Sequence, residues 1–405
     1  MFLNLQWVKV HRVRICAKPD LRAPSTLLPP ARNKWRPYRI KIVTLLCCLL
    51  GASALSAKSA TPKYAENFSL EPKDGYQLLS IRNGALSENS VKQYALVPRG
   101  QPETKIPDNT TLIHTPVTRV VVMETVYIGY LEALDALDAI IAAGTADFIS
   151  QKTIRARVEN GEIARVQVGQ SLDIEKLLLL QPDLILTSVS GDPRFDVPAS
   201  LARTGLPVLL TAGYLEANPL ARAEWIKCLA ALFGKEAEAD RIFDAVDRRY
   251  QTLKALTADE AVRPTVFSGA PYSGAWYVPA GESYMAKAIR DAGGDYLWSD
   301  VPKTGAIPLD TERVFLKAAN ADFWINPSHY QTLSSLFAAD PRFAKFSAAG
   351  KGSVFNNTRQ VGSGGGNAIW ERGVVHPDQV LADLIKIFHP ELLPDHAFVY
   401  YEAIR

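Results

Sequence analysis

Two glutamates, Glu175 and Glu312, occupy the same position in a pattern that occurs twice in the chain. Residues 172–176 read LDIEK and residues 309–313 read LDTER. Each is followed by an apolar run with helical spacing, by an aspartate and by a strand-like segment. Two exposed carboxylates in related positions would form a two-point docking surface, because surface charges steer and orient a partner. Alternatively, both are solvated acids at helix N-termini, where the helix dipole favours them.

Other candidate motifs carry less chemistry. The histidines beyond residue 57 are His114, His329, His376, His389 and His396, and none has an H-x-H or H-E-x-x-H spacing. A bare zinc or manganese site is therefore disfavoured, since it needs converging His and carboxylate ligands. The glycine run VGSGGGN at 361–367 lacks the Lys-Ser/Thr ending of a phosphate loop, and we expect a flexible loop there. No G-x-G-x-x-G opens a predicted α/β segment and no G-x-S-x-G is present, which argues against an enzyme.

The elements that position these residues alternate between helix and strand. Residues 125–144 have the apolar spacing of one helix closed by a glycine. The alternation fills residues 119–234 and again residues 259–405, with a long helix at 235–258 between them. A repeat spaced this widely predicts two related lobes rather than a solenoid. We therefore predict an α/β fold with two Rossmann-like lobes joined by a long backbone helix.

Residues 58–118 precede the first lobe and have a different pattern. The segments YQLLSIRN and VKQYALVPRG alternate between apolar and polar residues, as half-buried strands do. A small β-rich appendage is expected there, and its residue types indicate no particular function.

Charge is distributed unevenly along this chain of 405 residues. Residues 1–57 contain ten Lys or Arg and one acid, which leaves 35 basic and 41 acidic residues and a net charge of −6 for the remainder. A mildly acidic body without a basic cluster argues against nucleic-acid binding.

Residues 36–57 have the pattern of a secretory signal peptide. Three basic residues precede an apolar core, and small residues offer a cleavage site near 54–57. The core is too short to span a bilayer. Neither Cys47 nor Cys48 follows a small residue, so a lipoprotein is not expected. We predict a soluble, exported protein, with residues 1–35 as a disordered or untranslated extension.

The whole pattern resembles the iron-siderophore, haem and cobalamin type of periplasmic substrate-binding protein that serves ABC importers. The resemblance covers about residues 117–393. It is carried by RVVVME…LEALDAL…IIAAG, LDIEKLLLLQPDLIL, the long helix at 235–258, DAGGDYLW, LDTERVFL and WERGVVHPDQVLADLIKIFHPEL. In that family a carboxylate on each lobe pairs with arginines of the membrane permease, and the matching positions here are Glu175 and Glu312.

The resemblance implies a periplasmic, monomeric, non-enzymatic protein. It would capture an iron complex (a siderophore or haem) or a corrinoid and deliver it to an ABC permease with its ATPase. No cofactor of the protein itself is implied, although the ligand can contain iron or cobalt.

The ligand is then expected between the lobes, at the carboxyl ends of the strands. The residues that follow predicted strands, and are therefore candidate contacts, are Tyr127, Arg194, Tyr214, Tyr272, Trp276, Tyr277, His329, Arg359 and Trp370. Aromatic side chains suit a large planar or macrocyclic ligand. Arginines suit its carboxylate, phenolate or phosphate groups. His329 would be able to ligate the iron of a haem or chelate.

Three other functions are compatible with two α/β lobes around a cleft. A related group of binding proteins holds bare zinc or manganese. The remaining two are a two-lobed periplasmic enzyme and a sensory adaptor with the same fold. Turnover of a substrate would favour the enzyme, and loss of import on charge reversal of Glu175 and Glu312 would separate transport from sensing.

Overall fold

The computed structural model describes residues 61–87, 90–101, 105–169, 171–189, 196, 201 and 203–405. These residues belong to one compact unit. The predicted signal peptide and the extension before it lie outside them. Among the described helices, none is both long enough and apolar enough to cross a bilayer.

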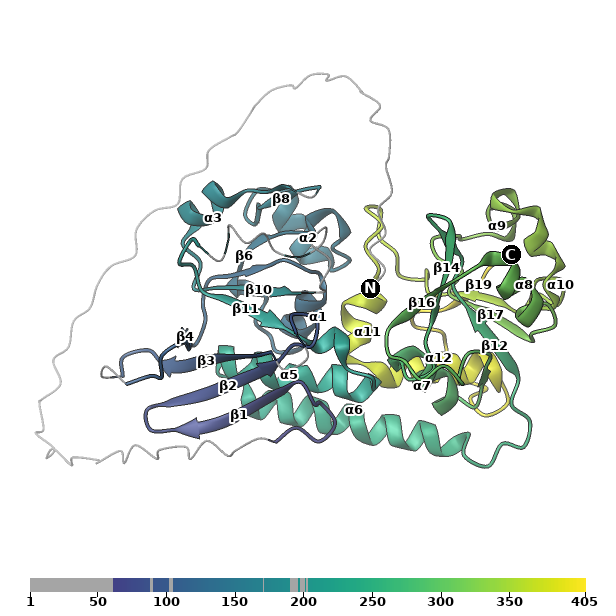
Figure 1. Cartoon of the computed structure of the whole chain (residues 1–405), viewed down its shortest axis with the longest axis horizontal. Coiled ribbons are helices and arrows are strands. Elements are labelled where there is room, and N and C mark those ends of the chain that lie inside the picture. Colours follow the sequence, from purple (N-terminus) through teal and green to yellow (C-terminus); the bar gives the residue numbers. More distant parts are fainter. Residues whose placement is uncertain are drawn as a thin grey trace, which may run out of the picture. The chain divides into compact units, whose positions relative to one another are not determined.

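The first lobe is built on a parallel sheet with the strand order β11-β10-β5-β6-β7 (Figure 1). Its strands are β5 (Val120–Val122), β6 (Ile140–Ala143), β7 (Ala164–Arg165), β10 (Leu184–Ser188) and β11 (Val208–Thr211), with a small hairpin of β8 (Gln167–Val168) and β9 (Ser171–Leu172). Its helices are α1 (Val126–Ala133), α2 (Lys152–Glu159) and α3 (Ile174–Leu180), with the short 3-10 helices η1 (Leu137–Ala139), η2 (Ala146–Phe148) and η3 (Gly213–Leu215). Strands β5 and β10 are covered on both faces, which explains their unbroken apolar sequences.

The prediction of a single helix over residues 125–144 is wrong. Helix α1 ends at Ala133, and Asp135 adopts a left-handed conformation with φ of 51°. The following residues Ile140–Ala143 then form strand β6, pairing with β5. A short apolar run fits a buried strand and a helix equally well, and here pairing with the sheet decides between them.

The second lobe has a sheet with the order β15-β12-β17-β18-β19, in which only β19 is antiparallel to its neighbour. Its strands are β12 (Thr265–Ser268), β15 (Asp295–Tyr296), β17 (Phe323–Ile325), β18 (Val354–Asn356) and β19 (Glu402–Ala403), and an antiparallel sheet is formed by β13 (Pro271–Tyr272), β14 (Ala275–Pro279) and β16 (Ala306–Leu309). Its helical elements are α7 (Tyr284–Asp291), α8 (Thr311–Ala318), α9 (Leu333–Ala339), η4 (Pro341–Lys345), α10 (Ser347–Gly350), η5 (Ala368–Trp370), α11 (Arg372–Val375) and α12 (Pro377–Phe388).

The two lobes share one topology. The order β6-β5-β10-β11 in the first corresponds to β15-β12-β17-β18 in the second. An aspartate holds the start of the equivalent strands β5 and β12. Asp183 accepts hydrogen bonds from the backbone N–H (2.8 Å) and hydroxyl (2.9 Å) of Thr118, just before β5, and Asp322 accepts the equivalent pair from Thr265 of β12 at 3.0 and 2.8 Å. The predicted α/β fold with two related lobes is therefore confirmed.

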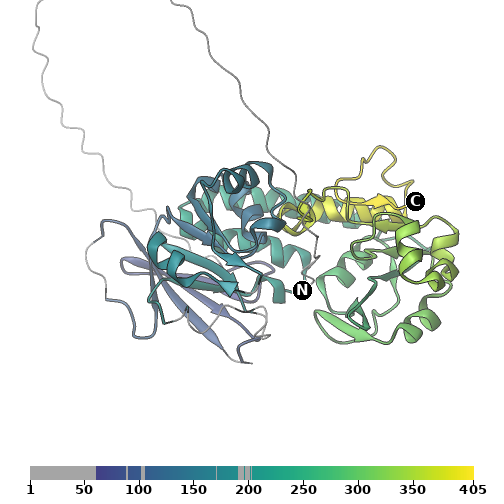
Figure 2. The same cartoon turned by 90° about the horizontal axis from the view of Figure 1, so that it is seen from above.

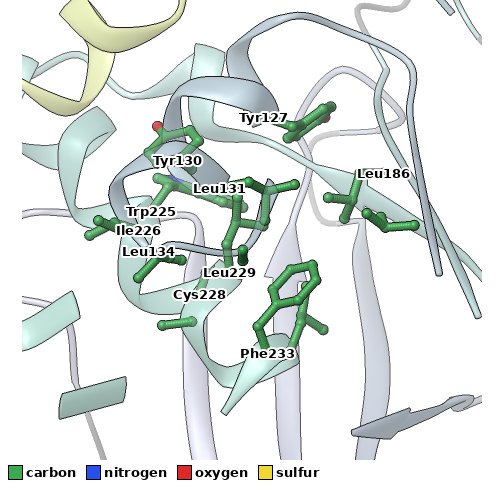
Figure 3. Close-up of a cluster of buried hydrophobic side chains, with 14 of the residues drawn as sticks. Tyr127, Tyr130, Leu131, Leu134, Leu186, Trp225, Ile226, Cys228, Leu229 and Phe233 are labelled. Carbon is green, nitrogen blue, oxygen red and sulfur yellow. The ribbon is translucent and has the colours of Figure 1, made fainter. Parts of the chain in front are cut away.

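Two helices follow the first lobe. Helix α5 (Pro219–Phe233) begins at the cap of Asn218 and ends at Gly234, whose φ of 66° suits glycine. It is buried almost all round, and its residues Trp225 to Phe233 pack against α1 in the core of the first lobe (Figure 3). Helix α6 (Glu236–Leu256) is amphipathic and contacts both α5 and α12.

The appendage is a sheet of β1 (Phe68–Lys73), β2 (Tyr76–Arg82), β3 (Val91–Pro98) and β4 (Thr111–Thr115). Its purple strands lie beside the teal elements of the first lobe in Figures 1 and 2, and α5 contacts β1 and β4. The segment before β1 is held by two buried carboxylates. Glu224 accepts the backbone N–H groups of residues 63–65, and Glu216 accepts those of residues 66 and 67.

The segment after β18 returns to the first lobe. Glu371, fully buried between η5 and α11, accepts hydrogen bonds from the Ser150 backbone N–H and hydroxyl, both at 2.6 Å, and from the Gln151 N–H at 3.1 Å. The glycine run at 361–367 packs there too, since a Cβ at Gly366 would lie 2.2 Å from the Phe148 carbonyl oxygen. The loop that the sequence predicts to be flexible is therefore in close contact with the first lobe.

We expect Gly366→Ala to lower the free energy of unfolding by about 1–3 kcal/mol, because the added methyl group has no room against the backbone of Phe148. Urea unfolding followed by tryptophan fluorescence measures the change. Gly350→Ala is the matched control, since nothing lies within 4 Å of a Cβ there. Equal midpoints for the two variants would contradict the close packing.

Candidate ligand-binding site

Polar side chains gather where the strands of the first lobe end. Ser188 is the last residue of β10, Thr211 is the last of β11, and Tyr214 lies in η3 directly afterwards. Together with Tyr127 of α1 they line a cavity of about 60 Å³. Carboxyl ends of parallel strands meet at one edge of the sheet, which is why residues distant in sequence converge. The structure thus brings together two predicted contacts, Tyr127 and Tyr214.

Both tyrosine hydroxyls are hydrogen-bonded within the lobe. The Tyr127 hydroxyl and Thr211 Oγ1 share a hydrogen bond of 2.8 Å, and the Tyr214 hydroxyl donates to the Val189 carbonyl. Only 2% of Tyr127 is exposed. Burial raises the pKa of Tyr214 to about 12. Both phenols are therefore neutral at physiological pH, and neither is a phenolate ready to ligate iron.

Glu124, which the sequence analysis missed, lies beside this cavity. Its Oε1 accepts hydrogen bonds from the Ser188 N–H (3.0 Å), the Ser188 hydroxyl (3.1 Å) and the Thr187 hydroxyl (3.2 Å). Its Oε2 is enclosed and has no partner in the part of the chain that the structure describes. Burial raises the pKa of Glu124 to about 7. The signal was present in the sequence, since a polar residue directly follows the apolar strand run RVVVM.

In the second lobe, Trp276 is not a ligand contact, and that prediction is corrected. Its side chain is fully buried among Phe267, Trp324 and Phe343, at ring distances of 6.3, 5.8 and 5.6 Å. Its indole N–H donates to the Ser268 carbonyl at 3.1 Å. Side chains alternate across a strand, so Trp276 points into the core while its neighbours on β14 point to the other face.

Four predicted contacts in the second lobe are accessible. Tyr272, on β13, is 49% exposed, and Tyr277 of β14 is half-buried. His329, after β17, is exposed, and its ring lies 4.3 Å from that of Tyr330. Partial burial lowers the pKa of His329. Arg359 is exposed after β18, where its backbone N–H donates to the Tyr400 carbonyl at 3.2 Å.

Trp370 is half-buried and lines a second cavity, of about 40 Å³. Its walls come from α5, α7, η5, α11 and α12, and include Met285, Ile369 and Val374. Arg222 of α5 lines both this cavity and the one at the strand ends of the first lobe. The remaining predicted contact, Arg194, lies outside the described residues.

The repeated glutamates are both exposed in the first turn of a helix, Glu175 on α3 and Glu312 on α8. Glu312 pairs with Arg342 at 3.4 Å. One helical turn further on, each helix presents an almost fully exposed leucine: Leu179 is 79% and Leu316 86% exposed. An acid and a leucine thus stand on the same helix face in both lobes.

No group of three or more His, Cys, Asp or Glu side chains arranged to hold a metal ion occurs among the described residues.

We expect the free energy of unfolding to fall as the pH rises from about 4.5 through 7, because the raised pKa of Glu124 means that the fold favours the protonated carboxyl. Glu124→Gln removes this dependence. Between pH 5 and pH 8, the free energy of unfolding of the wild type should therefore fall by about 2 kcal/mol more than that of the variant. Urea unfolding at both pH values measures it. Glu236→Gln, at an exposed acid of α6, is the control, and an unchanged slope in Glu124→Gln would refute the assignment.

Comparison with known proteins agrees with this architecture. A sequence profile described as "Periplasmic binding protein" matches residues 120–360. The uncharacterized lipoprotein MJ0878 of Methanocaldococcus jannaschii is 30% identical over 311 residues, which cover 73% of this chain and 72% of that protein. That protein is named a lipoprotein, whereas the sequence analysis does not expect this chain to be one. Cys47 and Cys48, on which that expectation rests, lie outside the described residues.

Solved structures show the same fold at low sequence identity. A periplasmic heme binding protein from Pseudomonas aeruginosa has a TM-score of 0.51 at 17% identity, over 68% of this chain and 94% of that one. A possible iron-binding periplasmic solute-binding protein from Staphylococcus epidermidis has a TM-score of 0.52 at 17% identity, over 67% and 99%. The profile match spans more than half of the chain, and we conclude that the protein belongs to the periplasmic binding protein family.

Proposed function

We propose that this protein is the solute-binding component of an ABC importer in the periplasm. It binds an iron complex (a siderophore or haem) or a corrinoid between its lobes, as a monomer without enzymatic activity. It then passes the ligand to a membrane permease driven by an ATPase. The single observation that carries the proposal is the convergence of aromatic and hydroxyl side chains at the strand ends in a chain of this family.

The class of ligand is inferred from chemistry and from relatives. Proteins of the same fold are named for heme in Pseudomonas aeruginosa and for bound Ni(II) in Helicobacter pylori. Aromatic side chains that remain accessible, Tyr272, Tyr277 and Trp370, suit a large planar or macrocyclic body. Arg359 and His329 supply a cation and an imidazole beside them.

Glu175 and Glu312 are proposed to dock the permease. In a parallel α/β unit the helix runs opposite to the strands, so its N-terminus lies at the edge where the strands end. A partner bound to both acids would therefore face the ligand side of each lobe. The exposed Leu179 and Leu316 add an apolar contact next to each charge.

Titration of the mature protein with haem, ferric siderophores and cobalamin is expected to quench tryptophan fluorescence and saturate at one equivalent for one of them. Haem would also give a Soret band. Arg359→Gln and Trp370→Leu are expected to weaken binding about 10-fold. Arg248→Gln, at an exposed arginine of α6, is the control and should leave the affinity unchanged. Absence of saturable binding to any of these chelates would overturn the proposal.

Charge reversal of both docking acids, Glu175→Lys with Glu312→Lys, is expected to reduce uptake of the bound chelate by cells more than 10-fold. The affinity of the purified protein for the chelate should not change, because neither side chain lines the cavities. Glu236→Lys, also an exposed acid in the first turn of a helix, is the matched control. Normal uptake by the double variant would exclude the docking role and favour a sensory function.

A further inference from the structure

Arg222 on α5 is a half-buried cation that pairs with no carboxylate of the described residues. Its Nε is enclosed and donates to no acceptor among the described residues. Its guanidinium carbon lies over the ring of Tyr284 on α7, 4.1 Å from the ring centroid. An arginine keeps its charge in proteins and carries five donors, so Arg222 can donate several hydrogen bonds to a ligand.

The nearest acids on the same stretch of chain are already engaged. Glu224, on α5, and Glu216, just before it, are both buried and accept the backbone N–H groups of residues 63–67. By contrast, Arg249 pairs with Asp378 at 2.7 Å. The charge of Arg249 is therefore neutralised within the fold, whereas that of Arg222 remains available to a ligand.

Arg222 lines two cavities, both of them mainly apolar. On one side are the hydroxyls of Tyr127, Ser188, Thr211 and Tyr214. On the other are apolar and aromatic side chains, including Trp370. Volumes of about 60 and 40 Å³ have room for a few small groups only, since one water occupies at least about 10–15 Å³ on the same measure. Both cavities are partly open, so a terminal group of a ligand can enter while the body of the ligand stays outside.

We propose that Arg222 binds a terminal anionic group of the ligand, a carboxylate or a phenolate, at the junction of the two cavities. A guanidinium fork matches such a group bidentately, and partial burial strengthens the contact. The proposal rests on the ligand-binding function above and narrows it. The transported chelate carries a negatively charged end, as the propionates of haem or the catecholates of a siderophore do, and is not a neutral complex.

The first experiment compares ligands that differ in this charge. Wild type, Arg222→Gln and Arg222→Lys are titrated with haem and haem dimethyl ester, and with a ferric tricatecholate and a neutral ferric trihydroxamate. Arg222→Gln is expected to weaken binding of the charged member of a pair about 10- to 100-fold and of the neutral member less than about 2-fold. Arg222→Lys should lie between, because it keeps the charge and loses the fork.

Arg248→Gln controls for the loss of one surface charge and should have no effect. Equal weakening of both members of a pair by Arg222→Gln would indicate a structural role and overturn the proposal. Unchanged affinity for the charged member, or an equal effect of Arg248→Gln, would overturn it as well. Far-ultraviolet circular dichroism and the urea midpoint check that the variants are folded.

The second experiment separates this inference from the proposed function. Salicylate carries one aromatic carboxylate, and Trp225 and Trp370 line the two cavities, so their fluorescence reports its binding. We expect saturable quenching of wild type at millimolar salicylate and at least 10-fold weaker binding by Arg222→Gln. Salicylate binding without chelate binding would refute the proposed function and retain the anion site. Chelate binding that is unchanged by Arg222→Gln, together with no binding of salicylate, would refute the anion site and retain the proposed function.

Discussion

The buried carboxylate of Glu371 holds together parts of the chain 221 residues apart. An ionised group removed from water needs new donors, and Ser150 and Gln151 of the first lobe supply three. The backbone at Glu371 lies so close to α1 that a Cβ at Gly129 would be 2.3 Å from its carbonyl oxygen. Trp370, the preceding residue, lines the cavity at Arg222. The shape of that cavity therefore depends on a hydrogen-bond cluster outside it.

Burial has opposite consequences for the two charged groups near the first-lobe cavity. Glu124 can respond to its enclosure by binding a proton, and its raised pKa, about 7, reflects this. Arg222 has no such option, because a guanidinium stays protonated. As Glu124 binds a proton below about pH 7, the site becomes biased towards positive charge. This bias complements the anionic end that we infer for the ligand, and it arises without any net positive charge on the body of the protein.

In the proposed function, one edge of each sheet has two tasks. Asp183 and Asp322 hold the opposite edges of the sheets, where β5 and β12 begin. The candidate ligand contacts follow the strands, and the helices α3 and α8 start at the same edge with Glu175 and Glu312 exposed. Ligand binding and permease docking are proposed to occur at this same edge. A permease bound to both acids would therefore also cover the proposed ligand site.

The sequence by itself determined the lobes, the long helix at 235–258 as a helical segment and the exposed repeat acids, because these depend on local periodicity and capping. The sequence was misleading where one pattern fits two structures. The apolar run at 140–143 was predicted to be helical, but it forms strand β6 because it pairs with β5. The same holds for Trp276, since the burial of an aromatic depends on which face of β14 meets the core. Only the tertiary structure revealed Arg222, because whether a guanidinium finds an acceptor among the described residues is a property of its surroundings and leaves no mark in the residue type.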